Sequence, residues 1–430
     1  MKARSRSTVA SLYAGLLFAL SPGVQAQSLP PEVQVGTKNV IDFEFDWGRD
    51  GNYCQTCNYG AGNNRLAYID SSGNVWVGHV DATTGDFVPT NGKETLVDID
   101  GVPSQAIGNG PEWLASRLAS GLVYTRQLEG SGGHKCVGVA HVDTDGVWQG
   151  GCMSRTNGAS LPLGTDIVGD YFPMVSFQNS SHPGFNVFWR LLSDGSAAHR
   201  VFTGSRAPPS RRWIPGTHDM VLVAGAPPDD SGHVYRQVFL YSTEDDSLQQ
   251  LTFGASDKNA PFMWQAPEFG SELVLLAVPG NSREADIYRY LLNPDGSSSW
   301  KIIKRIHGTP DYPYVASPEP FVYQGKSWVF FEIAAAPRQL GDFAPSQIAI
   351  SGIEPDVPSF RVLTEDAGPD LHARRDPEYY ITANGPYLYY NRYILPAGGG
   401  ATQTEGVFRV DVGLGPPQAH ATYPAMQARH

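Results

Sequence analysis

The stretch from Ala260 to Ile306 reads APFMWQAPEFGSELVLLAVPGNSREADIYRYLLNPDGSSSWKIIKRI. It contains four short runs rich in β-branched and aromatic residues. Polar segments with glycine, proline, asparagine and serine separate these runs, and such residues form turns. The stretch therefore predicts four consecutive β-strands joined by short loops.

A proline-glutamate pair from this stretch recurs along the chain. The spacing is about 50 residues or, in one long gap, about three times that value, which is typical of propeller blades. Two degenerate units fill the long gap, near Phe172-Pro173-Met174 and Trp213-Ile214-Pro215. The glutamates of the pairs are Glu112, Glu268, Glu319 and Glu378.

These units predict an all-β, seven-bladed β-propeller. The alternating strand Lys38–Trp47 stands outside the first unit, and the last unit, Asp376–Val412, has three strands. Pairing the N-terminal strand with the last blade would remove two open edges at once. We expect one propeller domain over residues 27–414 and a disordered tail over residues 415–430.

The first residues predict export. Lys2, Arg4 and Arg6 precede an apolar run that is too short to span a bilayer, and Val24-Gln25-Ala26 supplies a cleavage site. A signal peptide over residues 1–26 makes the protein secreted or periplasmic, with no membrane anchor. The net charge of −12 argues against nucleic acid as a partner. We expect a monomer.

The four cysteines predict two disulfides in an oxidising compartment. Cys136 begins one predicted strand and Cys152 ends the next, so antiparallel pairing brings them side by side. Elimination then leaves Cys54 and Cys57 as the second bridge. A single Cys-x-x-Cys without matching histidines is weak evidence for zinc.

The unit Arg211–Phe253 ends in Phe239-Leu240-Tyr241-Ser242-Thr243, a polar turn and Leu251-Thr252, and it resembles the blades of TolB-like propellers. As a whole the chain resembles the secreted seven-bladed propeller polysaccharide lyases in blade number, export and its histidine and arginine content. It is similar most of all to the lyases that act on rhamnosyl-glucuronate bonds. This resemblance implies an acidic plant-type or bacterial polysaccharide as partner and cleavage at a uronate by β-elimination.

Elimination needs a base near neutral pH and a cation beside the uronate. On the lyase interpretation His79 takes the proton and Arg155 orients the sugar or stabilises the developing charge. His134 and His182 are the reserve bases, and His182 also serves substrate binding. The candidates for neutralising the uronate are Arg211, Arg212 and Arg375.

Each of these assignments has a structural alternative. Gly78-His79-Val80-Asp81 is repeated as Ala140-His141-Val142-Asp143, which favours a structural histidine. The arginines would equally form ion pairs with local acids such as Asp376 and Glu378.

Two other functions compete with the lyase. A glycoside hydrolase would use the Asp and Glu residues, because hydrolysis of a glycosidic bond needs two carboxyl groups. A non-catalytic propeller would bind a glycan or protein at the same mouth. The chain lacks Gly-x-Ser-x-Gly and phosphate-loop motifs. No cofactor is predicted, although Asp46–Asn52 carries oxygen ligands for a structural calcium ion without the usual alternating spacing.

Overall fold

The computed structural model describes residues 29–417 except for a set of short gaps. The gaps are residues 38, 47, 50–51, 54–63, 89–93, 104–109, 116–119, 129–133, 144, 154–158, 164–166, 169–171, 180–183, 191–196, 204–209, 215–216, 218, 243, 339–342 and 398–400. The predicted signal peptide, Cys54 and Cys57 lie outside the described residues, and so does the tail from residue 418 onward.

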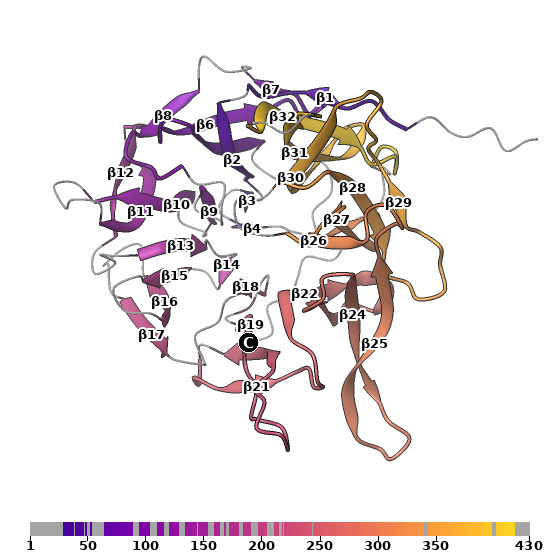
Figure 1. Cartoon of the computed structure of the whole chain (residues 1–430). Coiled ribbons are helices and arrows are strands. Elements are labelled where there is room, and N and C mark those ends of the chain that lie inside the picture. Colours follow the sequence, from indigo (N-terminus) through magenta and orange to yellow (C-terminus); the bar gives the residue numbers. More distant parts are fainter. Residues whose placement is uncertain are drawn as a thin grey trace, which may run out of the picture.

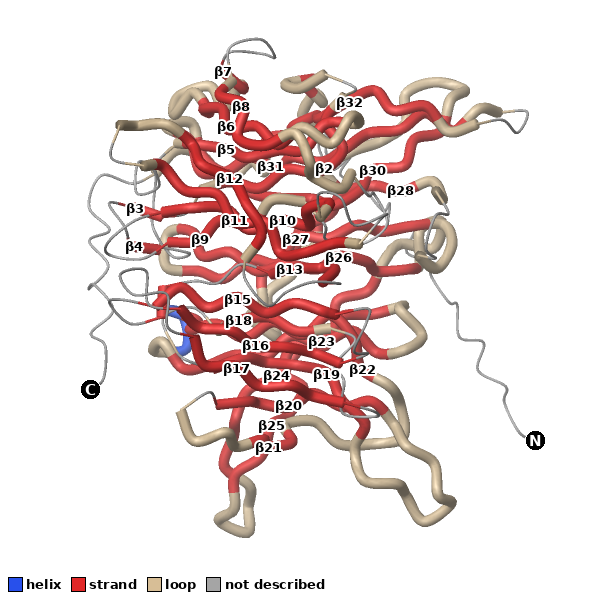
Figure 2. The backbone as a smooth tube through the Cα atoms, turned by 90° about the vertical axis from the view of Figure 1, so that its left-hand side faces the viewer, coloured by secondary structure: helices blue, strands red, loops and turns tan. Residues whose placement is uncertain are grey.

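The described residues form seven antiparallel sheets of four or five strands, which surround a central axis (Figure 1). This arrangement confirms the all-β propeller. Figure 2 shows the sheets from the side, with one short helical segment, η2 (Pro267–Phe269). A separate pair, β3 (Gly48–Arg49) and β4 (Asn52–Tyr53), belongs to none of the seven sheets.

Each sheet is called a blade and is numbered along the chain. Blade 1 contains β2 (Val40–Phe45), β5 (Arg65–Asp70), β6 (Val75–Val80), β7 (Phe87–Val88) and β8 (Thr95–Asp98). Blade 2 contains β9 (Glu112–Ala115), β10 (Ser120–Gln127), β11 (Lys135–Val142) and β12 (Trp148–Cys152). Blade 3 contains β13 (Ala159–Leu163), β14 (Ile167–Val168), β15 (Phe172–Asn179), β16 (Gly184–Arg190) and β17 (Ala197–Thr203).

The remaining four blades have four strands each. Blade 4 contains β18 (Arg211–Trp213), β19 (Asp219–Gly225), β20 (Arg236–Ser242) and β21 (Leu248–Gln250). Blade 5 contains β22 (Lys258–Ala266), β23 (Glu272–Pro279), β24 (Glu284–Leu292) and β25 (Ser298–His307). Blade 6 contains β26 (Tyr314–Tyr323), β27 (Lys326–Ala334), β28 (Ser346–Gly352) and β29 (Arg361–Val362). Blade 7 contains β30 (Leu371–Thr382), β31 (Gly385–Leu395), β32 (Gln403–Asp411) and β1 (Val33–Gln34).

The N-terminus closes the last blade, as predicted, but through a different segment. The two-residue strand β1 pairs with β32, where Val33 lies opposite Arg409. The predicted closing strand is instead β2, which pairs with β5 at the inner edge of blade 1. The correction has a simple cause: Val40–Phe45 alternates apolar and acidic residues and suits an inner strand as well as an edge strand.

A buried ion-pair network, here called the closure clamp, holds this junction. Glu32, next to β1, receives hydrogen bonds from Arg374 Nε and Nη2 at 2.8 Å each and from the Tyr390 hydroxyl at 2.6 Å. Arg392 Nη1 lies 3.4 Å from the same carboxylate. Bidentate pairing of this kind is strong when the partners are shielded from water. The clamp therefore fastens the first described residues to β30 and β31.

Apolar side chains fill the spaces between blades. One core cluster joins blades 1, 6 and 7 and includes Phe45, Phe330 and Tyr389, all fully buried. Hydrogen bonds also cross these spaces, for example from the Tyr389 hydroxyl to the Gly85 carbonyl at 2.7 Å. Buried aromatic rings with a satisfied hydroxyl stabilise such contacts strongly.

The Cys136–Cys152 disulfide is present, with the Cα atoms 5.8 Å apart. It links β11 to β12, the two outer strands of blade 2, as the strand pairing predicts. In the part of the chain that is described, no helix has the length and apolar character needed to cross a bilayer.

Candidate functional site

The inner strands of six blades each present one half-buried side chain between two buried neighbours. In β2, for example, Phe43 and Phe45 are buried while Glu44 keeps partial access to solvent. Successive residues of a strand point to opposite sides, so this alternation selects one residue per strand. The six residues are Glu44, Glu112, Arg212, Phe262, Glu319 and Glu378.

The inner strands that carry these residues face the axis of the propeller (Figure 1). Arg212 Nη2 of blade 4 lies 3.6 Å from Glu319 Oε1 of blade 6, although blade 5 stands between them in the ring. The Arg212 guanidinium also lies 4.9 Å from the centre of the Phe262 ring. Side chains from non-adjacent blades can touch only where the inner strands converge. We call the four glutamates, Arg212 and two further acids, Asp42 and Asp376, the axial cluster.

A proline bulge sets this geometry in three consecutive blades. The pairing of inner and second strands shifts by one residue between Asn259 and Phe262, between Ala316 and Glu319, and between Arg375 and Glu378. In each bulge a residue with positive φ precedes a proline, which needs no ladder hydrogen bond. The residues with positive φ are Ala260 (44°), Ser317 (42°) and Asp376 (56°).

The bulge corrects one member of the predicted repeat. In blade 5 the equivalent of Pro318-Glu319 is Pro261-Phe262, and Glu268 belongs to η2 instead. Glu268 accepts hydrogen bonds from Ser327 N at 2.8 Å and Ser327 Oγ at 2.9 Å, so it joins blade 5 to blade 6. Pro261-Phe262 and Pro267-Glu268 are six residues apart, and only the strand pairing shows which of them is equivalent to Pro318-Glu319.

Five carboxyl groups of the axial cluster, the four glutamates and Asp42, have raised pKa values and hold their protons more tightly than free carboxylic acids. Burial raises the pKa of Glu112 to about 7, and the charge of Asp376 adds to the effect while Arg212 opposes it. Burial likewise raises the pKa of Glu319 to about 7, again against the influence of Arg212. Repulsion among neighbouring carboxylates and loss of hydration both favour the neutral acid.

The pKa values of Asp42, Glu44 and Glu378 shift in the same direction. Burial raises the pKa of Glu44 well above its ordinary value, with further contributions from Glu112 and Glu319. Burial raises the pKa of Glu378 as well, and here the charge of Glu44 is the largest added cause. The pKa of Asp42 is raised by burial and by the charge of Asp376, although the Gly110 backbone N–H donates to its carboxylate at 3.1 Å.

A second layer of charges supports blade 7 beside the cluster. Glu332, which is buried, accepts a hydrogen bond from the backbone N–H of Asp376 at 2.9 Å and so holds the bulge residue. Arg338 Nη1 lies 3.4 Å from one Glu332 oxygen and Arg375 Nε lies 3.7 Å from the other. Burial lowers the pKa of Arg375, with Arg338 as a further cause.

The structure brings only some of the predicted site residues to the axial cluster. Arg212 belongs to the axial cluster, and Arg375 is next to Asp376 of the cluster in β30. Arg211 is buried in β18, where burial and the charge of Arg212 lower its pKa to about 9. Arg155 and His182 lie outside the described residues.

His79 stands apart from the cluster. It is an exposed residue of β6, the third strand of blade 1, opposite Arg65 of β5. Two strands therefore separate His79 from the axis. Three of the four predicted proline-glutamate pairs, those of Glu112, Glu319 and Glu378, supply glutamates of the axial cluster.

The described residues contain no group of three or more His, Cys, Asp or Glu side chains placed to hold a metal ion. The absence of a cofactor and the structural calcium site remain predictions, and Asp46–Asn52 is only partly described.

Comparison with known proteins gives similarity in fold only. No protein-family model and no curated protein matches the chain. The propeller domain of Myceliophteria thermophila Cps50 (Swd1) is 9% identical, covers 89% of this chain and 98% of its own, and gives a TM-score of 0.48. The Dos1 propeller is 10% identical over 89% of this chain and 94% of its own, with a TM-score of 0.44.

A longer protein is also similar. One of two prolyl endopeptidases from a structural study is 10% identical and matches 88% of this chain with a TM-score of 0.45. This chain spans about half of that peptidase, since the match covers 51% of it.

Proposed function

We propose that the axial cluster is the active site of a secreted glycoside hydrolase. The observation that carries the proposal is the presence of Glu112 and Glu319, with a pKa of about 7 each, on opposite sides of Arg212 in the ring of blades. Near neutral pH such a pair supplies both a protonated acid and an ionised carboxylate. Hydrolysis of a glycosidic bond needs these two groups together.

One turnover combines a proton transfer to the glycosidic oxygen with cleavage of the glycosidic bond. The protonated member of the pair donates its proton to the glycosidic oxygen, and the bond from that oxygen to the anomeric carbon breaks. The ionised member either attacks the anomeric carbon or removes a proton from the attacking water. Water supplies the hydroxyl of one product, and the donor regains its proton at the end. Arg212 limits how far both pKa values rise, which keeps one carboxyl group ionised.

The charge balance of the cluster favours a neutral substrate. The axial cluster holds six carboxyl groups and one guanidinium, that of Arg212, which lies near Glu319 and acts on Glu112, while Arg338 and Arg375 lie against Glu332. An acidic polysaccharide would meet repulsion from every ionised carboxylate, whereas a neutral glycan meets hydrogen-bond acceptors and acids. The half-buried Phe262 ring, next to Arg212, adds an apolar face for a sugar ring.

The experiment is a screen of neutral and uronate-containing polysaccharides with the purified protein. We expect new reducing ends from a neutral glycan and no absorbance of an unsaturated uronate. Glu112→Gln and Glu319→Gln should each lower kcat by about 10²–10⁴-fold, because each loses an acid–base group. Glu268→Gln is the matched control, since Glu268 also follows a proline but binds Ser327. Full activity in both cluster variants would refute the proposal.

The lyase is the second candidate, and the partly exposed side chain of Arg212 favours it. This guanidinium, 38% exposed, could face a uronate carboxylate. A lyase would raise the ultraviolet absorbance of unsaturated uronate with an acidic polysaccharide, and Arg212→Met would abolish that signal. Loss of that activity in His79→Ala would restore His79 as the base.

A further inference from the structure

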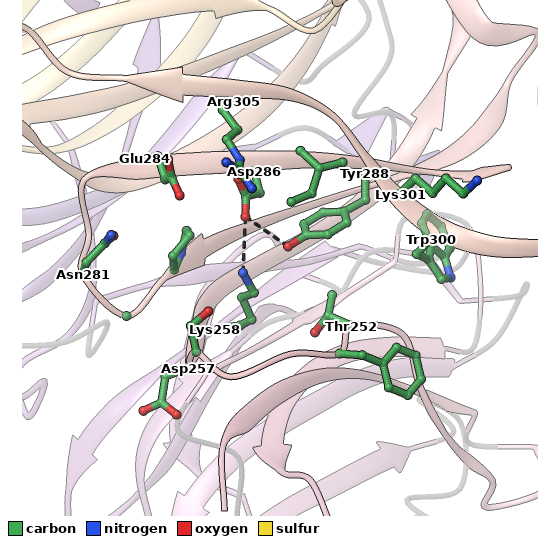
Figure 3. A pocket seen from close by; sticks show the side chains of 15 residues that line it. Thr252, Asp257, Lys258, Asn281, Glu284, Asp286, Tyr288, Trp300, Lys301 and Arg305 are labelled. Atoms are coloured by element: carbon green, nitrogen blue, oxygen red, sulfur yellow. Dashed lines mark hydrogen bonds and ion pairs between the residues drawn. The ribbon is translucent and has the colours of Figure 1, made fainter. Parts of the chain in front are cut away.

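A pocket of about 800 Å³ opens between blades 4 and 5, outside the axial cluster (Figure 3). Its walls come from the connection between β21 and β22, from the loop after β23 and from the facing parts of β24 and β25. The volume falls within the range of about 300–1,000 Å³ that ligand pockets occupy. The pocket is therefore large enough for a small ligand or for a few units of a polymer.

Aromatic side chains line one part of the pocket. Phe253 is 74% exposed and Trp300 is half-buried, so both present ring surface to solvent. Tyr288 also lines the pocket, although its ring is mostly buried. Exposed aromatic faces beside polar groups are the usual wall of a site for an amphipathic ligand.

A buried polar group faces the same space. The Asp286 side chain is 2% exposed, and its Oδ2 accepts hydrogen bonds from Lys258 Nζ at 3.2 Å and the Tyr288 hydroxyl at 3.1 Å. Its other oxygen, Oδ1, is buried and accepts no hydrogen bond, although Arg305 Nε lies 3.3 Å away. Asp286 therefore holds the Lys258, Tyr288 and Arg305 side chains that form the polar part of the wall.

The formal charges of the lining cancel, because three acidic side chains face three basic ones. A ligand with high net charge would therefore gain little from the pocket as a whole. The acids are Asp257, Glu284 and Asp286, and the bases are Lys258, Lys301 and Arg305.

We infer that this pocket binds the hydroxyl groups and ring faces of a neutral oligosaccharide, as a binding site separate from the axial cluster. Exposed polar side chains of the lining, such as Asn281 and Arg305, bind the ligand hydroxyls, and Trp300 and Phe253 contact the sugar rings. The inference goes beyond the proposed hydrolysis and does not depend on it. A polymer held here would be presented to the axis, since Lys258 and Phe262 belong to the same strand, β22.

The test measures binding without catalysis. The full chain carrying Glu112→Gln is titrated by calorimetry with cellotetraose, xylotetraose and mannotetraose as neutral probes and tetragalacturonate as the anionic probe. We expect at least one neutral probe to bind and tetragalacturonate not to bind. In a separate experiment on the unsubstituted protein, the neutral probe is tested as an inhibitor of the hydrolysis of a long polymer.

Variants locate the binding. Trp300→Ala and the surface change Phe253→Ser should each raise Kd about tenfold, the loss of one aromatic contact. Leu292→Ala is the matched control, because Leu292 is 71% exposed on the same β24–β25 hairpin but does not line the pocket. Lys301→Ala should change Kd roughly twofold or less, since exposed ionic contacts contribute little to a neutral ligand.

Three outcomes would overturn the inference: no binding of any neutral probe, binding of the anionic probe alone, or neutral binding that ignores both aromatic variants. Failure of the proposed function gives a different pattern, in which the neutral probe binds and Trp300→Ala weakens it while no polysaccharide is hydrolysed.

Discussion

The closure clamp and the axial cluster both bring charged side chains from distant parts of the chain into the interior, yet their electrostatics are opposite. In the clamp, Glu32 faces Arg374 and Arg392, and these contacts lower its pKa although burial acts against them. In the axial cluster, Glu44 and Glu378 face mainly other carboxylates, and their pKa values are raised.

The contrast distinguishes charged groups that stabilise the fold from carboxyl groups whose mutual repulsion the fold must overcome. A buried carboxylate with guanidinium partners stabilises the closed ring, and removing Glu32 leaves the buried Arg374 with Asp366 as an ion-pair partner at 3.0 Å but without its bidentate one. Carboxyl groups that repel each other reduce stability when ionised, and folded proteins retain such arrangements mainly at functional sites. The clamp is therefore structural, and the axial cluster is the better candidate for chemistry.

Breaking the clamp should have the largest effect on stability. Glu32→Ala leaves Arg374, whose side chain is fully buried, without its bidentate partner. We expect the free energy of unfolding to fall by about 3–5 kcal/mol. Urea denaturation measures this change, with Glu378→Gln as the matched control that should leave stability equal or higher. Equal losses in the two variants would remove the distinction between the regions.

Removing the Cys136–Cys152 disulfide changes stability at a place remote from both the closure clamp and the axial cluster. The Cys136→Ser and Cys152→Ser double variant opens a bridge across 16 residues and should cost about 3 kcal/mol. Activity at a temperature where the variant remains folded should keep its ordinary pH profile. A shifted profile would mean that the outer strands of blade 2 control Glu112 on its inner strand.

The dependence of stability on pH should also differ between the regions. The pKa of Glu112 and Glu319 rises from 4.5 in the unfolded chain to about 7 in the folded one. Their contribution is fully present below pH 4.5 and is lost as pH rises through about 7. Glu32, whose pKa is lowered, contributes above pH 4.5, and its contribution is lost as pH falls through its folded pKa.

This difference is measured by urea denaturation from about pH 2 to pH 8, a range that includes the acid-side window of Glu32. Glu112→Gln should flatten the loss of stability between pH 4.5 and 7, whereas Glu32→Gln should flatten the loss on the acid side. An unchanged slope in Glu112→Gln would show that Glu112 is ionised throughout that range.

The smallest effect is expected from Arg212. Its positive charge lowers the pKa of both Glu112 and Glu319. Arg212→Met should therefore move the alkaline limb of the activity profile upward by about one pH unit. The pH–rate profile of the variant checks this shift, and Arg211→Lys serves as the control on the same strand. A downward shift would contradict the assigned role of Arg212.

Local patterns predicted much of the fold. The four short runs of Ala260–Ile306 predicted four consecutive strands, which are β22 to β25 of blade 5, and the cysteine positions predicted the Cys136–Cys152 bridge. The recurring prolines also predicted the repeat of blades. They recur because each bulge takes a residue that needs no ladder hydrogen bond.

The residues of the axial cluster could not be predicted from local sequence patterns alone. Blade 5 offers Pro261-Phe262 and Pro267-Glu268, and only the pairing with β23 shows that Phe262 occupies the inner position. The same limit applies to β2, which local alternation could not assign to blade 1. The raised pKa values belong to acids on four strands that converge on one axis, β2, β9, β26 and β30, so no single segment carries that signal.

The most direct test of the axial cluster is a ¹³C NMR titration of the glutamate carboxyl groups in the labelled protein, assigned with Glu112→Gln and Glu319→Gln. We expect two resonances, from Glu112 and Glu319, to titrate near pH 7. Titration of every glutamate below about pH 5, as in ordinary exposed carboxyl groups, would contradict this expectation.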